Sequence, residues 1–262
     1  MKFSGLCVTC NDELHLKECL ESISFCDEVI VVDLHSTDRS REIAIECGAR
    51  VVEHEWVPAV EFVREYAVGL AHNEWVMVMD PDTVFPTHLA GFVMSTLEEN
   101  PEIGIVECMQ RYYFLGKPIR YGRWGGFSGF PAIYRKGAIE IRPLIHRSNS
   151  FRPGVQTITL SYEEKDLIKH YWADSLGQFL KKQKRYIRME GSARYQLGER
   201  YHFGRIVLEV PRALISSLIL RKGFMDGWRG VYLSFFYAWY NWRALLSLKQ
   251  YQSVQESSRR AT

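Results

Sequence analysis

Short apolar runs alternate with segments of helical periodicity over the first hundred residues of the chain. Continuous apolar runs of this kind are typical of strands that are buried on both faces. The predicted strands are Gly5–Thr9, Glu28–Asp33, Ala49–Glu53 and Trp75–Asp80. The predicted helices between them are Glu13–Ser22, Asp38–Cys47 and Val60–Ala71. This alternation favours an α/β fold, with a mostly parallel, Rossmann-like sheet that is flanked by helices.

Later elements follow a less regular pattern. The predicted elements are a helix at Pro86–Asn100, strands at Ile103–Met109 and Ala132–Arg135, and a helix at Asp174–Arg188. The stretch 111–129, RYYFLGKPIRYGRWGGFSG, is rich in Gly and aromatic residues. It predicts a hairpin followed by a lid near the active site, since Gly-rich connections suit lids. An ordinary loop with packed aromatic side chains is the alternative.

Two aspartates stand at the end of the fourth predicted strand, in the sequence VMVMDPD. A buried strand that ends in Asp80 and Asp82 offers oxygen ligands for a hard cation such as Mg²⁺ or Mn²⁺. Such a cation would neutralise the phosphates of a nucleotide. Because Asp and Pro are also common turn residues, a plain turn is the alternative interpretation.

Polar side chains also follow the first two predicted strands. Thr9, Asn11 and Glu13 lie at the end of the first strand, and Asp33 ends the second. Ligands of parallel sheets bind beyond the carboxyl ends of the strands, where the strand order reverses. Acceptor groups at three strand ends on one rim therefore predict a nucleotide site.

Charge is distributed unevenly along the 262-residue chain, although the formal net charge is only +2. Residues 1–169 contain 17 Lys and Arg against 25 Asp and Glu, a net charge of −8. Residues 170–262 contain 16 against 6, a net charge of +10. A basic end suggests an anionic partner, either nucleic acid or a membrane. Nucleic acid fits poorly, because the aromatic residues occur among aliphatic residues at helical spacing and no nucleic-acid-binding motif is present.

The six cysteines all lie in residues 1–108, mostly in apolar or helical stretches, which indicates reduced thiols in a cytoplasmic protein. Cys7 and Cys10 form a CxxC sequence without a second pair downstream, so a zinc site is not expected. No signal peptide is predicted, because Met1 leads directly into a strand pattern.

The segment from Arg205 to Gln250 is apolar, with scattered cations and aromatic residues. Its apolar stretches are interrupted or too short to span a bilayer, which needs about 20 residues. Cations interleaved with Trp and Tyr are typical of amphipathic helices that lie on anionic lipid. We therefore expect a main domain at residues 1–200 and an amphipathic helical appendage at residues 201–262 that associates with a membrane. A helical hairpin packed on the main domain, or buried in a homo-oligomer interface, is the alternative.

The order TCNDELHLKECLESISFCDEVIVVDLHSTDRS, followed by VREYAVGLAHNEWVMVMDPD, resembles the family 2 nucleotide-sugar glycosyltransferases with the GT-A fold. This resemblance covers about residues 4–110. Further sequences are similar to the WaaE-like transferases of the lipopolysaccharide core, namely YYFLGKPIRYG, the pair His170-Tyr171, FLKKQKRYI and GFMDGWRGVYLSFFYAWY.

The resemblance implies roles for residues on the predicted rim. Those that would hold the nucleoside are Thr9, Asn11, Glu13 and Asp33, with Asp33 facing the uracil. Arg64 matches the basic position in the helix before the metal strand, and Asp80, Asp82 and Arg185 would lie near the diphosphate. Asp80 and Asp82 match the DxD metal motif, with Asp82 as the more direct ligand of Mg²⁺ or Mn²⁺. Solvated helix cations are the alternative for Arg64 and Arg185.

The general base is where the sequence departs from the relatives. They often carry a His-Glu pair where this chain has His146-Arg147. Either the base has moved to Glu163, Glu164 or Asp166, or His146 contributes, or the acceptor chemistry differs. Glu164 and His146 are the expected catalytic candidates.

The resemblance implies an inverting, metal-assisted transfer of a hexose from a UDP-sugar, with UDP-glucose as the expected donor. The acceptor would be a hydroxyl of a lipid-linked, lipopolysaccharide or other polysaccharide molecule at the cytoplasmic face of the inner membrane. Two rival functions stay open. A nucleotidyltransferase would usually show a Gly-rich basic loop after the first strand, which CNDELHL lacks. A non-catalytic nucleotide-sugar-binding membrane scaffold would explain the missing glutamate after His146.

Overall fold

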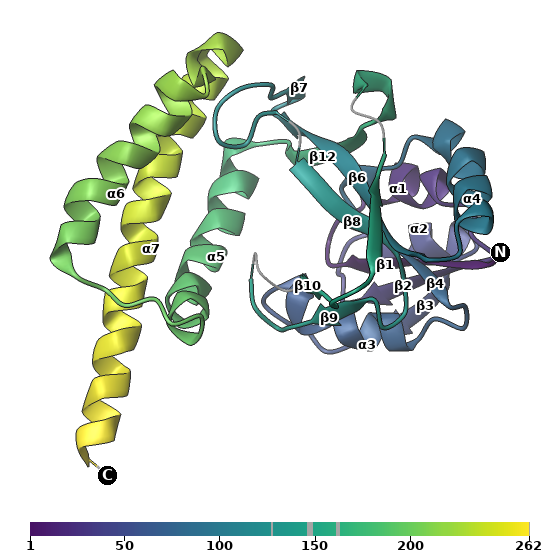
Figure 1. Ribbon diagram of the computed structural model, residues 1–262, viewed down its shortest axis with the longest axis horizontal. Helices are drawn as coiled ribbons and strands as arrows, with labels where there is room; N and C mark the ends of the chain where they lie inside the picture. Colours follow the sequence, from purple (N-terminus) through teal and green to yellow (C-terminus); the bar gives the residue numbers. More distant parts are fainter. Residues whose placement is uncertain (127, 146–148, 161–162, 262) are drawn as a thin grey trace. The chain divides into compact units, whose positions relative to one another are not determined.

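The computed structural model describes residues 1–126, 128–145, 149–160 and 163–261, which form two compact units (Figure 1). The first unit comprises Met1–Arg111 and Phe127–Tyr171, and the second comprises Tyr112–Gly126 and Trp172–Thr262. The predicted domain boundary after residue 200 stays a prediction.

The first unit begins with the expected alternation of strands and helices. Its opening elements are β1 (Phe3–Thr9), α1 (Leu16–Ser22), β2 (Glu28–Asp33), α2 (Ser40–Glu46), β3 (Arg50–Glu53), η1 (Val60–Phe62), α3 (Arg64–Gly69) and β4 (Trp75–Met79). The later elements are β5 (Thr83–Val84), η2 (Thr87–Leu89), α4 (Ala90–Glu99), β6 (Ile103–Phe114), β8 (Ser128–Arg135), β9 (Ile139–Ile141), β10 (Asn149–Phe151), β11 (Gln156–Thr159), η3 (Glu164–Asp166) and β12 (Ile168–Ala173).

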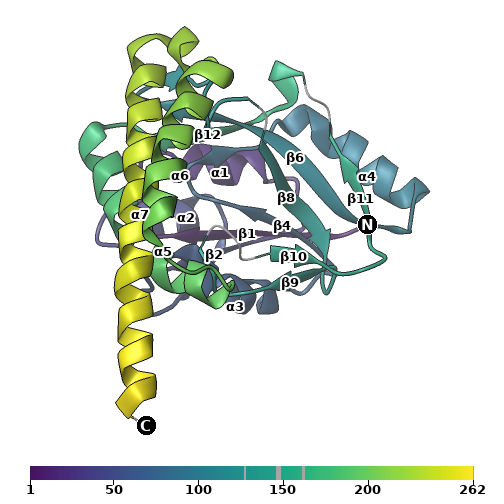
Figure 2. The ribbon, with the colours of Figure 1, turned by 60° about the vertical axis from the view of Figure 1, so that its left-hand side comes forward.

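The central sheet has the strand order β3-β2-β1-β4-β8-β6-β12-β5. β3, β2, β1 and β4 are parallel, whereas β8 pairs antiparallel with both β4 and β6. Figure 2 shows the strands of the sheet crossing the unit with helices beside them. The predicted α/β fold class is confirmed, with the parallel half at the amino end of the chain and the antiparallel half after it.

Helices cover both faces of the sheet. Successive strand residues point to opposite faces, so each face presents its own set of apolar side chains to the helices. On one face, Cys7 and Met77 pack in a cluster with residues of α1, α2 and α4. On the other face, Val8 and Val32 pack with Val63 and Ala67, which lie in and beside α3. Both faces of β1 and β4 are therefore buried, as their continuous apolar sequences indicate.

Glu28 ties three segments together at the amino end of β2. Its carboxylate accepts hydrogen bonds from Ser4 Oγ at 2.5 Å, from His72 N at 2.7 Å and from His72 Nδ1 at 2.8 Å. Burial would raise the pKa of Glu28, but the hydrogen bonds from Ser4 and His72 outweigh burial and lower the pKa to about 2.

We expect Glu28→Gln to destabilise the protein in a pH-dependent manner. A depressed folded-state pKa contributes stability above the unfolded pKa, and this contribution is lost as the pH falls through the folded pKa, here about 2. The substitution should cost about 2–3 kcal/mol at neutral pH and little near pH 2. Urea unfolding of the wild type and the variant across this range measures the effect. An equal cost at both ends would show that the carboxylate charge is not responsible; the exposed Glu102→Gln serves as the control.

The second unit is helical and aromatic. Its elements are β7 (Lys117–Pro118), α5 (Leu176–Gln196), α6 (Phe203–Ile215), the π-helical turn η4 (Ser216–Leu220), η5 (Gly223–Asp226) and α7 (Gly227–Ala261). Phe114, Trp172, Phe179 and Phe236 belong to its core, and α5 and α6 both pack against α7. None of the helices in the described ranges carries an apolar stretch long enough to cross a bilayer.

The Gly-rich stretch 111–129 begins with the predicted hairpin. Phe114 pairs with Lys117 across a two-residue turn in which Leu115 and Gly116 both have positive φ, as a type I′ turn requires. Beyond the hairpin, backbone amides of residues 120–123 donate hydrogen bonds to the side chains of Asp226 and Ser217. Asp226 accepts from the amides of Arg120 and Tyr121 at 2.9 and 2.7 Å, and Ser217 Oγ accepts from the amide of Arg123 at 3.1 Å.

Candidate nucleotide and metal site

The strand order reverses between β1 and β4. The chain lays down β1, β2 and β3 in one direction and then returns to place β4 on the other side of β1. A crevice at the carboxyl ends of such strands is the usual ligand site of a parallel sheet. Thr9 ends β1, and Asp80 directly follows β4, so the predicted rim lies at this point.

The loops after β1 and β2 are bound to each other. The side-chain oxygen of Asn11, whose φ is 61°, accepts from the amide of Thr37 at 2.7 Å. Glu13 accepts from the amide of Arg39 at 3.0 Å, and the amide of Glu13 donates to Asp38 at 3.1 Å. The side chains of Asn11 and Glu13 therefore shape the rim by joining its two loops.

Thr9 and Asp33 are almost fully buried at the ends of their strands, at 1% and 2% exposure. The Asp33 carboxylate accepts from the amide of Ser36 at 3.2 Å, which fixes its orientation. The Thr9 hydroxyl has no hydrogen-bond partner among the described residues. Because buried polar groups are nearly always hydrogen-bonded, this hydroxyl is suited to a polar ligand or an ordered water.

Arg64 is the first residue of α3, and its side chain is 8% exposed. Its guanidinium lies 3.4 Å from a carboxylate oxygen of Asp80. The alternative of a solvated helix cation is therefore wrong for Arg64. A buried cation beside the first aspartate of the pair holds positive charge at the corner where a diphosphate was predicted. Burial raises the pKa of nearby Tyr134 to about 12, with Arg64 opposing the rise, so this phenol stays neutral.

Asp82 lies beside a histidine that is distant in sequence. Nε2 of His170 is 3.4 Å from Oδ1 of Asp82, and both side chains are mostly buried. β12 brings the two together, because His170 pairs with Thr83 and the Tyr171 amide donates to the Asp82 carbonyl at 2.7 Å. Nδ1 of His170 lies 3.2 Å from the side-chain oxygen of Gln110.

The donor set of this corner fits a hard cation. In the tautomer of His170 in which Nδ1 donates to Gln110, the Nε2 atom presents a lone pair towards the Asp82 carboxylate. Two acceptors that face one another are stabilised by a cation between them. Within the described ranges no cluster of three or more His, Cys, Asp or Glu side chains is already arranged as a metal cage. In nucleotide-dependent sites, Mg²⁺ typically binds to one or two carboxylates together with substrate phosphates.

Glu164 is engaged by Arg111 in a two-point contact. Both of its carboxylate oxygens accept from the guanidinium, at 3.2 and 2.9 Å. Arg111 follows Gln110 on β6, and successive strand residues face opposite sides of a sheet. Each carboxylate oxygen of Glu164 already accepts one hydrogen bond and keeps a lone pair for a further donor.

Two further base candidates, Asp166 and Glu163, contact neighbouring side chains. Asp166 is buried and contacts His88 Nε2 at 2.7 Å, while Glu163 lies 3.0 Å from Lys165. His146 lies outside the described residues. Arg185 is on α5 in the second unit, exposed, with its guanidinium over the ring of Tyr186 at 5.5 Å.

His170 and Gln110 were not predicted as site residues. The His-Tyr pair at 170–171 was noted only as a point of resemblance. A useful signal would have been its position, because a polar residue inside the apolar alternation of 168–173 is typical of a strand that contributes to a site.

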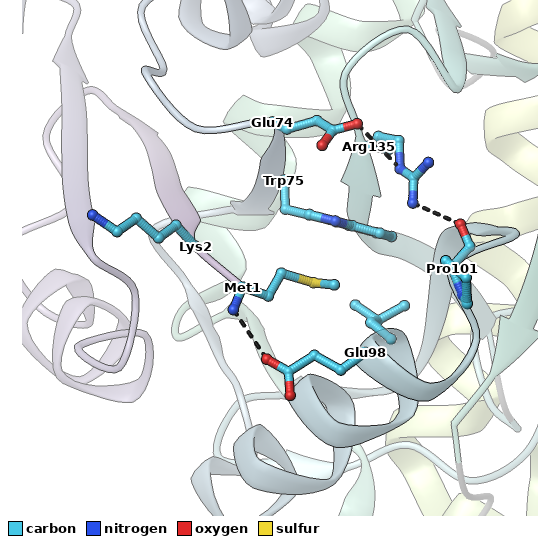
Figure 3. A pocket seen from close by; sticks show the side chains of 8 residues that line it. Met1, Lys2, Glu74, Trp75, Glu98, Pro101 and Arg135 are labelled. Carbon is cyan, nitrogen blue, oxygen red and sulfur yellow. Dashed lines mark hydrogen bonds and ion pairs between the residues drawn. The ribbon is translucent and has the colours of Figure 1, made fainter.

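A pocket of about 510 Å³ lies elsewhere, at the amino ends of the strands (Figure 3). Met1 and Trp75 line it, the amino terminus contacts Glu98 at 3.0 Å, and Arg135 lies over the Trp75 ring at 5.2 Å. Parallel sheets bind ligands at the opposite ends of their strands. This pocket is therefore separate from the candidate site.

Comparison with known proteins identifies the family. The model of the family described as Glycosyl transferase family 2 matches residues 6–155, which include the reversal point and both aspartates. Uncharacterized glycosyltransferases of Rickettsia typhi and Rickettsia bellii are each 23% identical to the chain over 255 residues. These alignments cover 95% of this chain and 87% and 86% of the two relatives, respectively.

Solved structures show a weaker likeness. Glucosyl-3-phosphoglycerate synthase from Mycobacterium tuberculosis, in complex with Mn²⁺, UDP and glucosyl-3-phosphoglycerate, is 23% identical with a TM-score of 0.37. The alignment covers 43% of this chain and 44% of that one. A likeness of this extent supports no inference about the ligands of the present protein.

Proposed function

Because the chain belongs to glycosyltransferase family 2, we propose that it is a metal-dependent, inverting enzyme that moves a hexose from a UDP-sugar to an acceptor hydroxyl. UDP-glucose is the proposed donor. The proposed acceptor is a lipid-linked, lipopolysaccharide or other polysaccharide molecule at the cytoplasmic face of the inner membrane. The observation that carries the proposal is the carboxylate pair Asp80 and Asp82 beside the strand-order reversal.

The rim would bind the nucleoside diphosphate through groups that the fold already holds in place. Asp33 and Thr9 offer a carboxylate and a hydroxyl at the carboxyl ends of β2 and β1, for the base and ribose. Arg64 would hold negative charge near Asp80. Asp80, Asp82 and Nε2 of His170 are the groups that would hold Mg²⁺ or Mn²⁺. When bound, the metal would supply positive charge to the leaving diphosphate.

Gln110 has a positioning role in this proposal. In the proposed metal-bound state, Gln110 would accept from Nδ1 of His170, and the Nε2 lone pair would then face Asp82. Groups that fix a ligating imidazole in this way typically raise metal affinity and keep the ring in one orientation.

Inversion requires a proton acceptor on the far side of the sugar from the leaving diphosphate. Glu164 and His146 stay the proposed candidates. The acceptor hydroxyl would lose its proton to one of these groups as it attacks the anomeric carbon, and the bond to the diphosphate breaks in the same step. Glu164 would take this proton on a carboxylate lone pair that Arg111 does not occupy.

One assay separates this function from its rivals. The full-length protein is incubated with radiolabelled UDP-sugars, MgCl₂ or MnCl₂, and a bacterial membrane extract, and UDP release and labelled product are measured. We expect UDP release with one preferred donor, its loss on addition of EDTA, and a β-linked product. UDP binding without turnover of any donor would favour a non-catalytic scaffold. Pyrophosphate release from a nucleoside triphosphate would favour a nucleotidyltransferase.

A further inference from the structure

One side of α6 and η4 is apolar and exposed. We call it the apolar stripe and define it by Phe203, Val207, Leu208, Ile215 and Ile219, whose exposure ranges from 48% to 71%. Phe203 and Val207 are four residues apart, and Leu208, Ile215 and Ile219 are seven and four residues apart, intervals close to whole turns of a helix, so that the five side chains together cover about half of the helix circumference. An exposed contiguous apolar surface of this kind usually marks an interaction site.

The apolar stripe continues into the turn between α6 and α7. We call this turn the hairpin tip and define it by the exposed residues Leu220, Phe224, Met225 and Trp228. Cations border it. Arg212, Arg221 and Lys222 are exposed, and the guanidinium of Arg229 lies 4.8 Å from the centre of the Trp228 ring.

The hairpin tip is presented by a fixed scaffold. The hydroxyls of Ser217 and Ser234 are 2.9 Å apart, and the amide of Gly122 donates to the carbonyl of Arg221 at 2.8 Å. The carboxylate of Asp226 is occupied by two backbone amides of the 120–123 segment. These hydrogen bonds fix the backbone of the hairpin tip, which carries the exposed apolar side chains.

The charges around the hairpin tip favour anionic lipid over a second copy of the chain as the partner. Between residues 210 and 230 the chain has four cations, Arg212, Arg221, Lys222 and Arg229, and Asp226 as its single carboxylate. A second copy meeting this surface would bring like charges together, which is unfavourable. Anionic lipid headgroups would neutralise the cations, while the acyl region would receive the apolar side chains.

We infer that α6 lies in the plane of an anionic bilayer surface, with the apolar stripe and the hairpin tip in the boundary between headgroups and acyl chains. Trp228 is well suited to this boundary, because its ring is apolar and its N–H is polar. The inference is independent of which sugar is transferred, and it can be tested without any donor.

The test is co-sedimentation of the full-length protein with phosphatidylcholine vesicles that contain or lack phosphatidylglycerol. We expect binding to the anionic vesicles that weakens with added salt. The double variant Leu220→Asp/Phe224→Asp should bind at least about tenfold more weakly. The matched control is Ile45→Asp/Phe92→Asp, which changes two equally exposed apolar residues of the first unit and should bind like the wild type.

A second variant tests the same surface in case the Asp substitutions disturb the fold of the tip. Arg221→Gln/Lys222→Gln keeps every apolar side chain and should reduce both the binding to anionic vesicles and its dependence on salt. Equal binding by the wild type and both tip variants would overturn the inference. So would a wild type that ignores vesicles but forms a dimer in sedimentation equilibrium that the Asp variant dissociates, since the surface would then serve a second copy.

Discussion

Asp82→Asn is expected to lower the rate of UDP release by about three orders of magnitude while the protein stays folded. The substitution preserves the size and shape of the side chain and removes its negative charge. Asp82 faces Nε2 of His170 at 3.4 Å, so the loss of charge would remove the electrostatic reason for a cation to sit between them. Initial rates over a range of Mg²⁺ and Mn²⁺ concentrations measure the effect.

The matched control is Glu102→Gln, which removes an exposed carboxylate near the amino end of β6 and should leave the rate unchanged. Circular dichroism and thermal unfolding check that the fold is intact. If Asp82→Asn kept more than about a tenth of the wild-type rate at every metal concentration, Asp82 would not be a metal ligand in the reaction.

Gly191→Ala is expected to destabilise the second unit by about 2–3 kcal/mol. Gly191 lies on α5 where α7 comes closest, and its amide lies 3.2 Å from Ser247 Oγ, to which it donates. A methyl group at this position would overlap the backbone carbonyl of Ser247, which cannot move without shifting α7. The unfolding free energy in urea measures the cost.

Gly177→Ala on the same helix provides the comparison. A methyl group there would meet nothing within 4 Å, so the change should be neutral or stabilise the helix by up to about 1 kcal/mol. Similar effects at both positions would mean that helix propensity, rather than the approach of α7, decides the outcome.

The buried parallel strands were predictable because their signal is local. β2 has the predicted bounds, and the other three strands differ from prediction by one or two residues at an end. Helix starts were less accurate. α1 begins at Leu16 rather than Glu13, because residues 11–13 bond instead to the loop after β2. Helix α2 begins at Ser40 rather than at Asp38, and its N-cap residue, Arg39, makes no side-chain hydrogen bond.

The candidate site was only partly visible in the sequence. Strand-end residues such as Asp33, Asp80 and Asp82 follow from local pattern and from family resemblance. The burial of Arg64 and the approach of His170 to Asp82 depend on pairings between distant segments, which periodicity cannot reveal. The partner of Glu164 was hidden for the same reason, since Arg111 lies on a strand far earlier in the chain.

The pairing of β5 with β12 also has a consequence for how the protein is made. His170 is synthesised well after Asp80 and Asp82, and after residue 155, where the family match ends. Such long-range strand pairings form late, because the chain loses the entropy of closing a large loop before the new contacts contribute any stability. A nascent chain would thus expose its two aspartates for some time without their histidine neighbour. The candidate metal corner would therefore be complete only once β12 had joined the sheet, so its ability to bind a metal would depend on a late step of folding in this unit.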